Sequence, residues 1–257
     1  MHRGGALGAP VVLTAAIAQR AADIEFTAGR EKLRGYVAVP EGRAPFAGVV
    51  LIPDVRGLYD HYREIARRFA DEGFATLALD IYSREGAPEL PELESVFRWM
   101  KALPDDRVLA DVRAAVEYLA SFDDVRSDAI AVTGFCMGGQ YALMAACAVP
   151  GIAACASWYG MLRYAETNEL KPRSPLEMAH ELACPYLGIF GEEDALIPMS
   201  DVEQLRTILA RSRYDTETIT YPRAGHAFFN DTRPEMYRPE AASDSWTKVV
   251  GFLRKQL

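Results

Sequence analysis

The sequence predicts an α/β protein in which a mainly parallel central sheet carries helices on both faces. The first observation is a set of short apolar runs, whose length and composition suit strands buried on both faces. These runs lie at 47–53, 74–79, 129–133, 152–159 and 185–190. The second observation is that helical segments alternate with them, at 59–72, 92–102, 105–122, 141–148 and 199–211. This alternation predicts right-handed crossovers between parallel strands.

The ends of the chain complete the pattern. A weakly alternating segment at 33–39 predicts an antiparallel edge strand, and segments 216–221 and 241–256 predict a last strand and a last helix. No repeat, linker or low-complexity tract divides the chain. We therefore expect residues 24–257 to form one domain, preceded by a flexible N-terminal extension over residues 1–23.

Composition narrows the class of partner. The chain has 257 residues, of which 50% are hydrophobic and 25% charged, as in ordinary soluble globular proteins,. The net charge of −8 and the lack of a long basic run argue against nucleic acid and anionic membrane surfaces as partners,. No segment is long and apolar enough to suggest a transmembrane helix,. A small-molecule partner fits these properties.

Two features bear on the compartment. Residues 1–18 place a basic start before an apolar stretch that ends in Ala16-Ile17-Ala18, so a cleaved signal peptide is an alternative to a simple extension,. The four cysteines form no CxxC pair and lack the spacing of a zinc site, which favours a reducing compartment, the cytoplasm, and a protein without a metal,. We expect three of the cysteines to pack in the core, namely Cys147, Cys155 and Cys184,.

The stretch with the clearest chemistry is Gly134-Phe135-Cys136-Met137-Gly138-Gly139. An apolar strand ends there and an Ala-rich helix begins, which is the pattern of a nucleophile elbow,. Glycines flank the central residue because strand and helix approach too closely for side chains. The central residue is Cys136, where a serine is more usual, and the positive end of the helix dipole favours its thiolate form. Alone, the motif is also compatible with a structural turn.

An acid and a base follow the elbow in the order nucleophile, acid, base that α/β-hydrolases use. Asp194 follows the strand at 185–190, and His226 lies in a loop after the strand at 216–221. Because the carboxyl ends of parallel strands share one sheet edge, the three side chains should meet. Glu192 and Glu193 are competing acids, but Asp194 lies furthest from the strand.

Several segments together resemble the dienelactone hydrolase (carboxymethylenebutenolidase-like) family of α/β-hydrolases, over residues 24–257. They are 134–139, 80–84, 158–160, 191–194 and 224–228. The resemblance implies an α/β-hydrolase fold, with Cys136 as nucleophile, His226 as base and Asp194 as the acid that orients it. It also implies that the Val55 and Met137 amides form the oxyanion hole.

The resemblance implies further residues around the thiol and the substrate. A family glutamate that contacts the resting thiol corresponds here to Asp54, which is one methylene shorter. Arg84 matches an arginine that binds a substrate carboxylate. A second family arginine corresponds to Asn230, and Arg56 is a nearby cation that could compensate. We expect aromatic side chains to line the substrate pocket, namely Tyr82, Trp158, Tyr159 and Phe228, whereas Trp99 suits the core better.

The function predicted from these features is hydrolysis of an ester or lactone through a thioester, with a dienelactone-like enol lactone favoured as substrate. No metal or organic cofactor is required, and a monomer or weak homodimer is expected. One alternative is a general carboxylesterase or thioesterase acting on neutral esters, or a small peptidase that carries cysteine in place of serine. A second alternative is a non-enzymatic thiol-sensing scaffold on the same fold.

Overall fold

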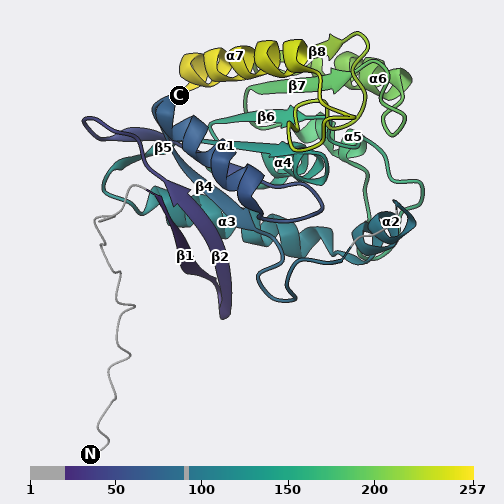
Figure 1. Cartoon of the computed structure of the whole chain (residues 1–257). Coiled ribbons are helices and arrows are strands. Elements are labelled where there is room, and N and C mark those ends of the chain that lie inside the picture. Colours follow the sequence, from purple (N-terminus) through teal and green to yellow (C-terminus); the bar gives the residue numbers. More distant parts are fainter. Residues whose placement is uncertain (1–20, 90–92) are drawn as a thin grey trace, which may run out of the picture.

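The computed structural model describes residues 21–89 and 93–257, and its centre is one eight-stranded sheet of order β1-β2-β4-β3-β5-β6-β7-β8 (Figure 1). The strands are β1 (Ala21–Ala28), β2 (Glu31–Ala38), β3 (Phe46–Ile52), β4 (Phe74–Asp80), β5 (Val125–Phe135), β6 (Ala154–Trp158), β7 (Tyr186–Gly191) and β8 (Thr216–Tyr221). The helices are α1 (Asp60–Asp71), α2 (Leu93–Ala102), α3 (Asp105–Ala120), α4 (Met137–Ala148), α5 (Pro175–Met178), η1 (Ala179–Glu181), α6 (Met199–Leu209) and α7 (Pro239–Gln256).

The pairing of the strands confirms a mainly parallel sheet with an antiparallel edge. β1 pairs antiparallel with β2, and β2 pairs antiparallel with β4. From β4 to β8 every pairing is parallel, as the strand–helix alternation predicts. The sequence analysis missed β1, so the expected boundary at residues 23 and 24 falls inside a strand. The signal-peptide alternative concerns residues that lie outside the described part of the chain.

Helices cover both faces of the sheet. Helices α1 and α7 pack on one face, against β4 and against β6 and β7, while α3 and α4 pack on the other, against β5 and its neighbours (Figure 1). Helix α4 is buried along most of its length, in keeping with its apolar and Ala-rich sequence,. None of the helices in the described ranges is both long and apolar enough to span a bilayer.

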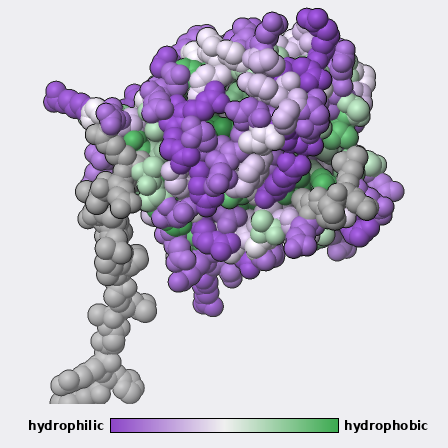
Figure 2. Space-filling model, in the orientation of Figure 1, coloured by the Kyte–Doolittle hydropathy of each residue, from purple (hydrophilic) through white to green (hydrophobic). Residues whose placement is uncertain are grey.

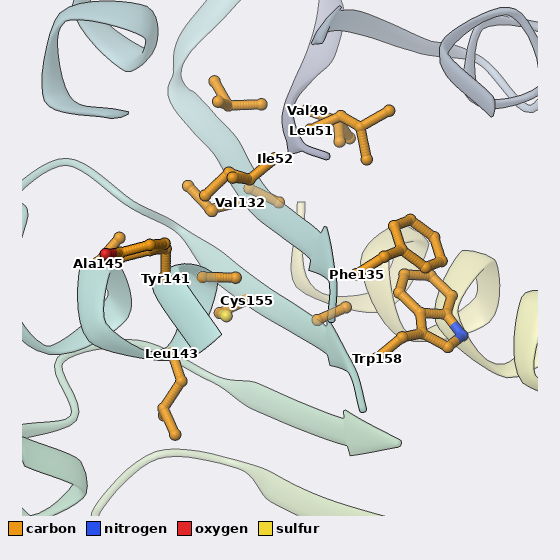
Figure 3. Close-up of a cluster of buried hydrophobic side chains, with 14 of the residues drawn as sticks. Val49, Leu51, Ile52, Val132, Phe135, Tyr141, Leu143, Ala145, Cys155 and Trp158 are labelled. Atoms are coloured by element: carbon orange, nitrogen blue, oxygen red, sulfur yellow. The ribbon is translucent and has the colours of Figure 1, made fainter. Parts of the chain in front are cut away.

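The core continues to the carboxyl end of the central strands. Figure 3 shows apolar side chains of β3, β5 and α4 around β5, with Phe135 and Trp158 at the strand ends. These two rings stack with centroids 4.4 Å apart and an interplanar angle of 13°. The aromatic stack fixes the ends of β5 and β6 side by side, next to the turn that carries Cys136,.

Two glycines allow strand β5 and helix α4 to meet at this turn. A Cβ atom on Gly134 would lie 2.1 Å from the Gly138 carbonyl oxygen, and one on Gly138 would lie 2.1 Å from the Ile52 carbonyl oxygen. Both contacts are with backbone, which cannot rotate away as a side chain can. The glycines of the motif are therefore required by the close approach of three backbone segments.

Gly138→Ala should lower the free energy of unfolding by about 3 kcal/mol or more, because the new methyl group forces β3 and α4 apart. Gly251→Ala is the matched control, since a Cβ at Gly251 meets no atom within 4 Å inside helix α7. That control should stabilise the protein by about 0.5–1 kcal/mol through helix propensity. Urea unfolding measures both changes, and equal effects of the two substitutions would refute the close-approach explanation.

Candidate active site

Cys136 occupies a strained turn between β5 and α4. Its backbone has φ 56° and ψ −119°, a region that residues with a side chain rarely adopt,. The Cys136 amide donates to the Trp158 carbonyl oxygen at 3.0 Å, and the Cys136 carbonyl accepts from the Gln140 amide at 3.0 Å. Bonds on both sides of the residue thus hold the strained conformation, which presents the thiol beyond the end of the strand.

The thiol, His226 and Asp194 form a continuous chain of contacts. His226 Nε2 lies 3.0 Å from Cys136 Sγ, and His226 Nδ1 lies 2.8 Å from Asp194 Oδ2. The Asp194 side chain is fully buried, and its Oδ1 accepts the Leu196 amide at 2.8 Å. The competing acids do not reach the imidazole: Glu193 is exposed, and Glu192 accepts the Thr220 hydroxyl at 3.0 Å. The geometry has the form of a nucleophile–base–acid triad.

Electrostatics favour a charged imidazole in this chain. Burial lowers the pKa of His226, but the negative charge of Cys136 and the hydrogen bonds to Asp194 and Cys136 outweigh it and raise that pKa to about 10,. The ordinary histidine pKa is about 6.5. At neutral pH the imidazole is therefore predominantly protonated, and it faces the sulfur as a cation.

The two expected oxyanion donors, Val55 and Met137, follow the carboxyl ends of the neighbouring parallel strands β3 and β5. Met137 is the first residue of α4, where backbone amides have no acceptor within the helix,. Val55 follows β3, and its carbonyl accepts the Tyr82 hydroxyl at 2.8 Å. Tyr82 is fully buried, so it supports the Val55 loop and does not line an open pocket as expected. Its hydrogen bond fixes the loop that carries Val55.

Asp54 follows β3, and its carboxylate binds groups other than the thiol. Its Oδ1 accepts the Arg56 amide at 2.8 Å, and its Oδ2 lies 3.5 Å from the Tyr59 hydroxyl. Among the residues that the structure describes, no hydrogen bond joins Asp54 to Cys136, so the expected thiol contact is replaced by the one from His226. Burial raises the pKa of Asp54, against the lowering effect of its hydrogen bonds from Arg56 and Tyr62.

Asn230 completes a neutral network around Asp54. Its Nδ2 donates to the Tyr59 hydroxyl at 2.9 Å, and its Oδ1 accepts the Thr232 hydroxyl at 2.6 Å. Asn230 is only 1% exposed, so the position is part of the packed wall of the site. Tyr59 and Thr232 were not predicted as part of the site. Tyr59 binds Asn230 from a distant part of the chain, and Thr232 binds it within one loop. Arg56 contributes its amide to this wall.

Arg84 is held by an acid of the protein itself. Its two terminal nitrogens bind the carboxylate of Asp111 at 2.6 and 2.8 Å, and the Asp111 side chain is 2% exposed. The hydrogen bonds and charge of Asp111 raise the pKa of Arg84, although burial opposes them. This bidentate pair occupies the edge of the guanidinium formed by its two terminal nitrogens, and Nε lies 3.6 Å from Glu31,. The structure therefore gives Arg84 a structural partner that the sequence analysis did not foresee.

The aromatic residues expected to line the pocket are mostly core. Trp158 and Phe228 are fully buried, and Tyr159 is 2% exposed. Tyr159 instead meets the His226 ring edge-on at 5.3 Å and so supports the base from one side. Trp99 is partly buried against the core and packs edge-on with Tyr82 at 5.8 Å. Trp158 and Tyr159 lie at the end of β6, where stacking with aromatic rings of neighbouring segments buries them,.

The three remaining cysteines pack in or against the hydrophobic core, as expected. Cys155 and Cys184 are buried and Cys147 is partly buried, and all three are free thiols. Burial raises the pKa of Cys147 to about 12 and that of Cys184 to about 12, so both are neutral at ordinary pH. Within residues 21–89 and 93–257, no group of three or more His, Cys, Asp or Glu side chains could hold a metal ion.

A sheet of this order, with a nucleophile elbow after β5 and an acid and base after β7 and β8, defines an α/β-hydrolase,. The model of the dienelactone hydrolase family matches residues 33–257, which is most of the chain. The chain therefore belongs to the dienelactone hydrolase family.

Individual relatives agree with the family model. A Yersinia pestis protein assigned as a carboxymethylenebutenolidase is 34% identical over 225 residues, covering 86% of this chain and 83% of the relative. A Bradyrhizobium protein assigned as a 2-oxo-3-(5-oxofuran-2-ylidene)propanoate lactonase is 34% identical over 231 residues, covering 90% and 92%. A crystal structure of a Klebsiella pneumoniae protein, assigned as a dienelactone hydrolase, superposes with a TM-score of 0.86 at 31% identity and covers 91% and 98%.

Arg84→Ala should lower the free energy of unfolding by about 3–5 kcal/mol, because it leaves the buried Asp111 carboxylate without its cation. Arg98→Ala is the control, since the Arg98–Glu94 pair is 73% and 81% exposed and its loss should cost less than about 1 kcal/mol,. Chemical denaturation measures both. Unchanged stability of Arg84→Ala, together with a selective loss of turnover on carboxylate-bearing esters, would instead make Arg84 a substrate ligand.

Proposed function

We propose that this chain hydrolyses carboxylic esters or lactones, with Cys136 as nucleophile, His226 as general base and acid, and Asp194 as the group that orients His226. The observation that carries the proposal is the pair of contacts at 3.0 Å and 2.8 Å that links sulfur, imidazole and carboxylate. Family membership supports it, because the family comprises ester and lactone hydrolases by its description and by the names of its members.

The first half of the reaction forms a thioester. The Cys136 sulfur attacks the carbonyl carbon, and the carbonyl oxygen becomes an oxyanion that accepts hydrogen bonds from the Val55 and Met137 amides. Each such donor contributes roughly 3–4 kcal/mol in comparable sites. As the tetrahedral intermediate collapses, protonated His226 gives its proton to the leaving alkoxide. With a lactone the leaving oxygen stays attached to the acyl group, so ring opening produces one tethered intermediate.

The second half regenerates the enzyme. His226, now neutral, takes a proton from a water molecule that attacks the thioester carbonyl, and the same two amides again stabilise the oxyanion. Collapse releases the carboxylic acid product and restores the sulfur anion facing a protonated imidazole. Asp194 keeps Nδ1 of His226 protonated throughout, so Nε2 exchanges the proton with the reacting groups.

Two substrate classes follow from different observations. An enol lactone is the first candidate, because a thiolate suits substrates with good leaving groups and because relatives are named for such lactones,. A neutral ester is the second candidate, because Arg84 is paired with Asp111 and Asn230 replaces the second arginine. A purely thiol-sensing role needs only the thiol, and the aligned His226 and Asp194 side chains argue against it.

The proposed function also includes a compartment, an oligomeric state and a class of partner. We infer a cytoplasmic enzyme that needs no added cofactor and works as a monomer or weak homodimer on a small molecule, without nucleic acid or membrane as partner. The free cysteines support a reducing compartment, in which a thiol nucleophile stays active,.

Cys136→Ala should reduce kcat/KM for p-nitrophenyl acetate by about 10³-fold or more, since both halves of the reaction use the sulfur. Cys136→Ser should keep a fraction of the activity. Rapid quenching of the wild type, followed by peptide mass spectrometry, should locate an acetyl group on Cys136. Cys147→Ala removes a thiol elsewhere in α4 and should leave kcat/KM unchanged. Full activity of Cys136→Ala would exclude the thiol as nucleophile.

A further inference from the structure

A cavity of about 580 Å³ opens at the carboxyl edge of the sheet, outside the triad. Its walls come from α2, from the segment at 161–166 that follows β6, and from the segment at 196–201 that follows β7 and begins α6. Figure 1 places α2 and α6 at this side of the molecule, where the arrowheads of the central strands end. The volume lies within the range of about 300–1,000 Å³ that small-molecule sites occupy.

The walls of this cavity are joined directly to the supports of the triad. The amide of Leu196, which lines the cavity, donates to Asp194 Oδ1 at 2.8 Å. The hydroxyl of Tyr164, another lining residue, accepts from the Gln140 side chain at 2.8 Å, and Gln140 lies on the first turn of the nucleophile helix. Met161 lies two residues beyond Tyr159, whose ring packs on His226. The cavity walls are therefore one hydrogen bond away from Asp194 and from the helix that follows Cys136.

Half of the residues that line the cavity are apolar, namely Phe97, Met100, Met161, Ala165, Leu196 and Pro198. Phe97 is 38% exposed, which is unusual here, because the only other large hydrophobic residue exposed in the described ranges is Leu170. Figure 2 shows apolar green atoms at the same side of the molecule. An exposed aromatic ring at the mouth of an apolar cavity is typical of a ligand-binding surface.

The cations around the cavity are already neutralised by the protein. Each lies within 3.0 Å of an acidic side chain: Lys101 of Glu166, Arg163 of Asp201 and Lys171 of Asp105. The third pair is 4% exposed on both sides, and the Tyr141 and Tyr164 hydroxyls also bind Asp105. An anionic ligand would compete with an acid of the protein at each cation, most strongly at the buried Lys171–Asp105 pair, whereas an uncharged apolar ligand gains from the walls without disturbing any pair,.

We propose that this cavity binds an uncharged, apolar substituent of the ester, an alkyl chain or aryl ring, and so determines which esters the enzyme prefers. The inference rests on the proposed hydrolysis at Cys136 and goes beyond it by assigning the specificity site. The substituent belongs to the acyl or to the alcohol part of the ester, and two substrate series distinguish these positions.

The first measurement compares p-nitrophenyl esters from acetate to hexanoate, and n-alkyl acetates from ethyl to hexyl followed by pH-stat. One series should show kcat/KM rising about fourfold for each added methylene that enters the cavity. The mono-p-nitrophenyl ester of adipic acid, which ends in a carboxylate, should be at least tenfold poorer than the hexanoate ester. Flat profiles in both series, or a preference for the adipate ester, would overturn the inference.

Two variants test whether the chain-length preference arises in this cavity. Phe97→Ala should flatten the chain-length dependence, so that the ratio of kcat/KM for the six-carbon ester to kcat/KM for the acetate falls about tenfold. Leu170→Ala is the matched control, because Leu170 is similarly exposed at 42% but lines a different cavity. The slope should persist in this control. A slope that survives in Phe97→Ala would show that the apolar group binds elsewhere.

The outcomes distinguish failure of the specificity inference from failure of the proposed hydrolase function. If acetate is hydrolysed at Cys136 and chain length has no effect, the specificity inference fails and the proposed hydrolase function stands. If Cys136→Ala hydrolyses all these esters as fast as the wild type, the proposed function fails first, whatever the chain-length profile.

Discussion

The contact between Cys136 Sγ and His226 Nε2, at 3.0 Å, is the interaction on which the rest of the site depends. It places the sulfur against the imidazole in a largely buried setting, where a charge pair is strong and an unpaired charge is costly. The other features of the site hold these two side chains in place. The glycines permit the strained turn that presents the sulfur. Asp194 binds Nδ1 of the imidazole, and the Tyr159 ring packs edge-on with it.

Around this pair, charged side chains are paired with opposite charges of the protein itself. Arg84 is paired with Asp111, the cations of the large cavity are paired with acids, and Asn230 joins Tyr59 in a neutral network beside Asp54. A pair that is already formed offers little to a charged substrate, because binding must first break it. The site thus combines a charged catalytic chain with surrounding charges that are paired within the protein.

Much of the fold and the centre of the site could be predicted from the sequence. Continuous apolar runs identified the parallel strands, and the order of Cys136, Asp194 and His226 matched three strand ends on one edge,. Strand β1 was missed because, as an edge strand, it buries little, chiefly Phe26, and so shows no clear pattern. The hydrogen bond between Tyr59 and Asn230 spans 171 residues, and the burial of Trp158 depends on its stack with Phe135. Such contacts between distant segments leave no local signal in a sequence.

The charge state of His226 tests the central claim most directly. Nuclear magnetic resonance titration of the ¹³C-labelled histidines should show the His226 ring protonated at neutral pH and losing its proton near pH 10, well above the ordinary value of about 6.5,. Because the sulfur charge contributes to this shift, Cys136→Ala should move the His226 pKa downward. A His226 ring that titrates near 6.5 in both proteins would contradict the sulfur–imidazolium pair, and with it the account of the site given above.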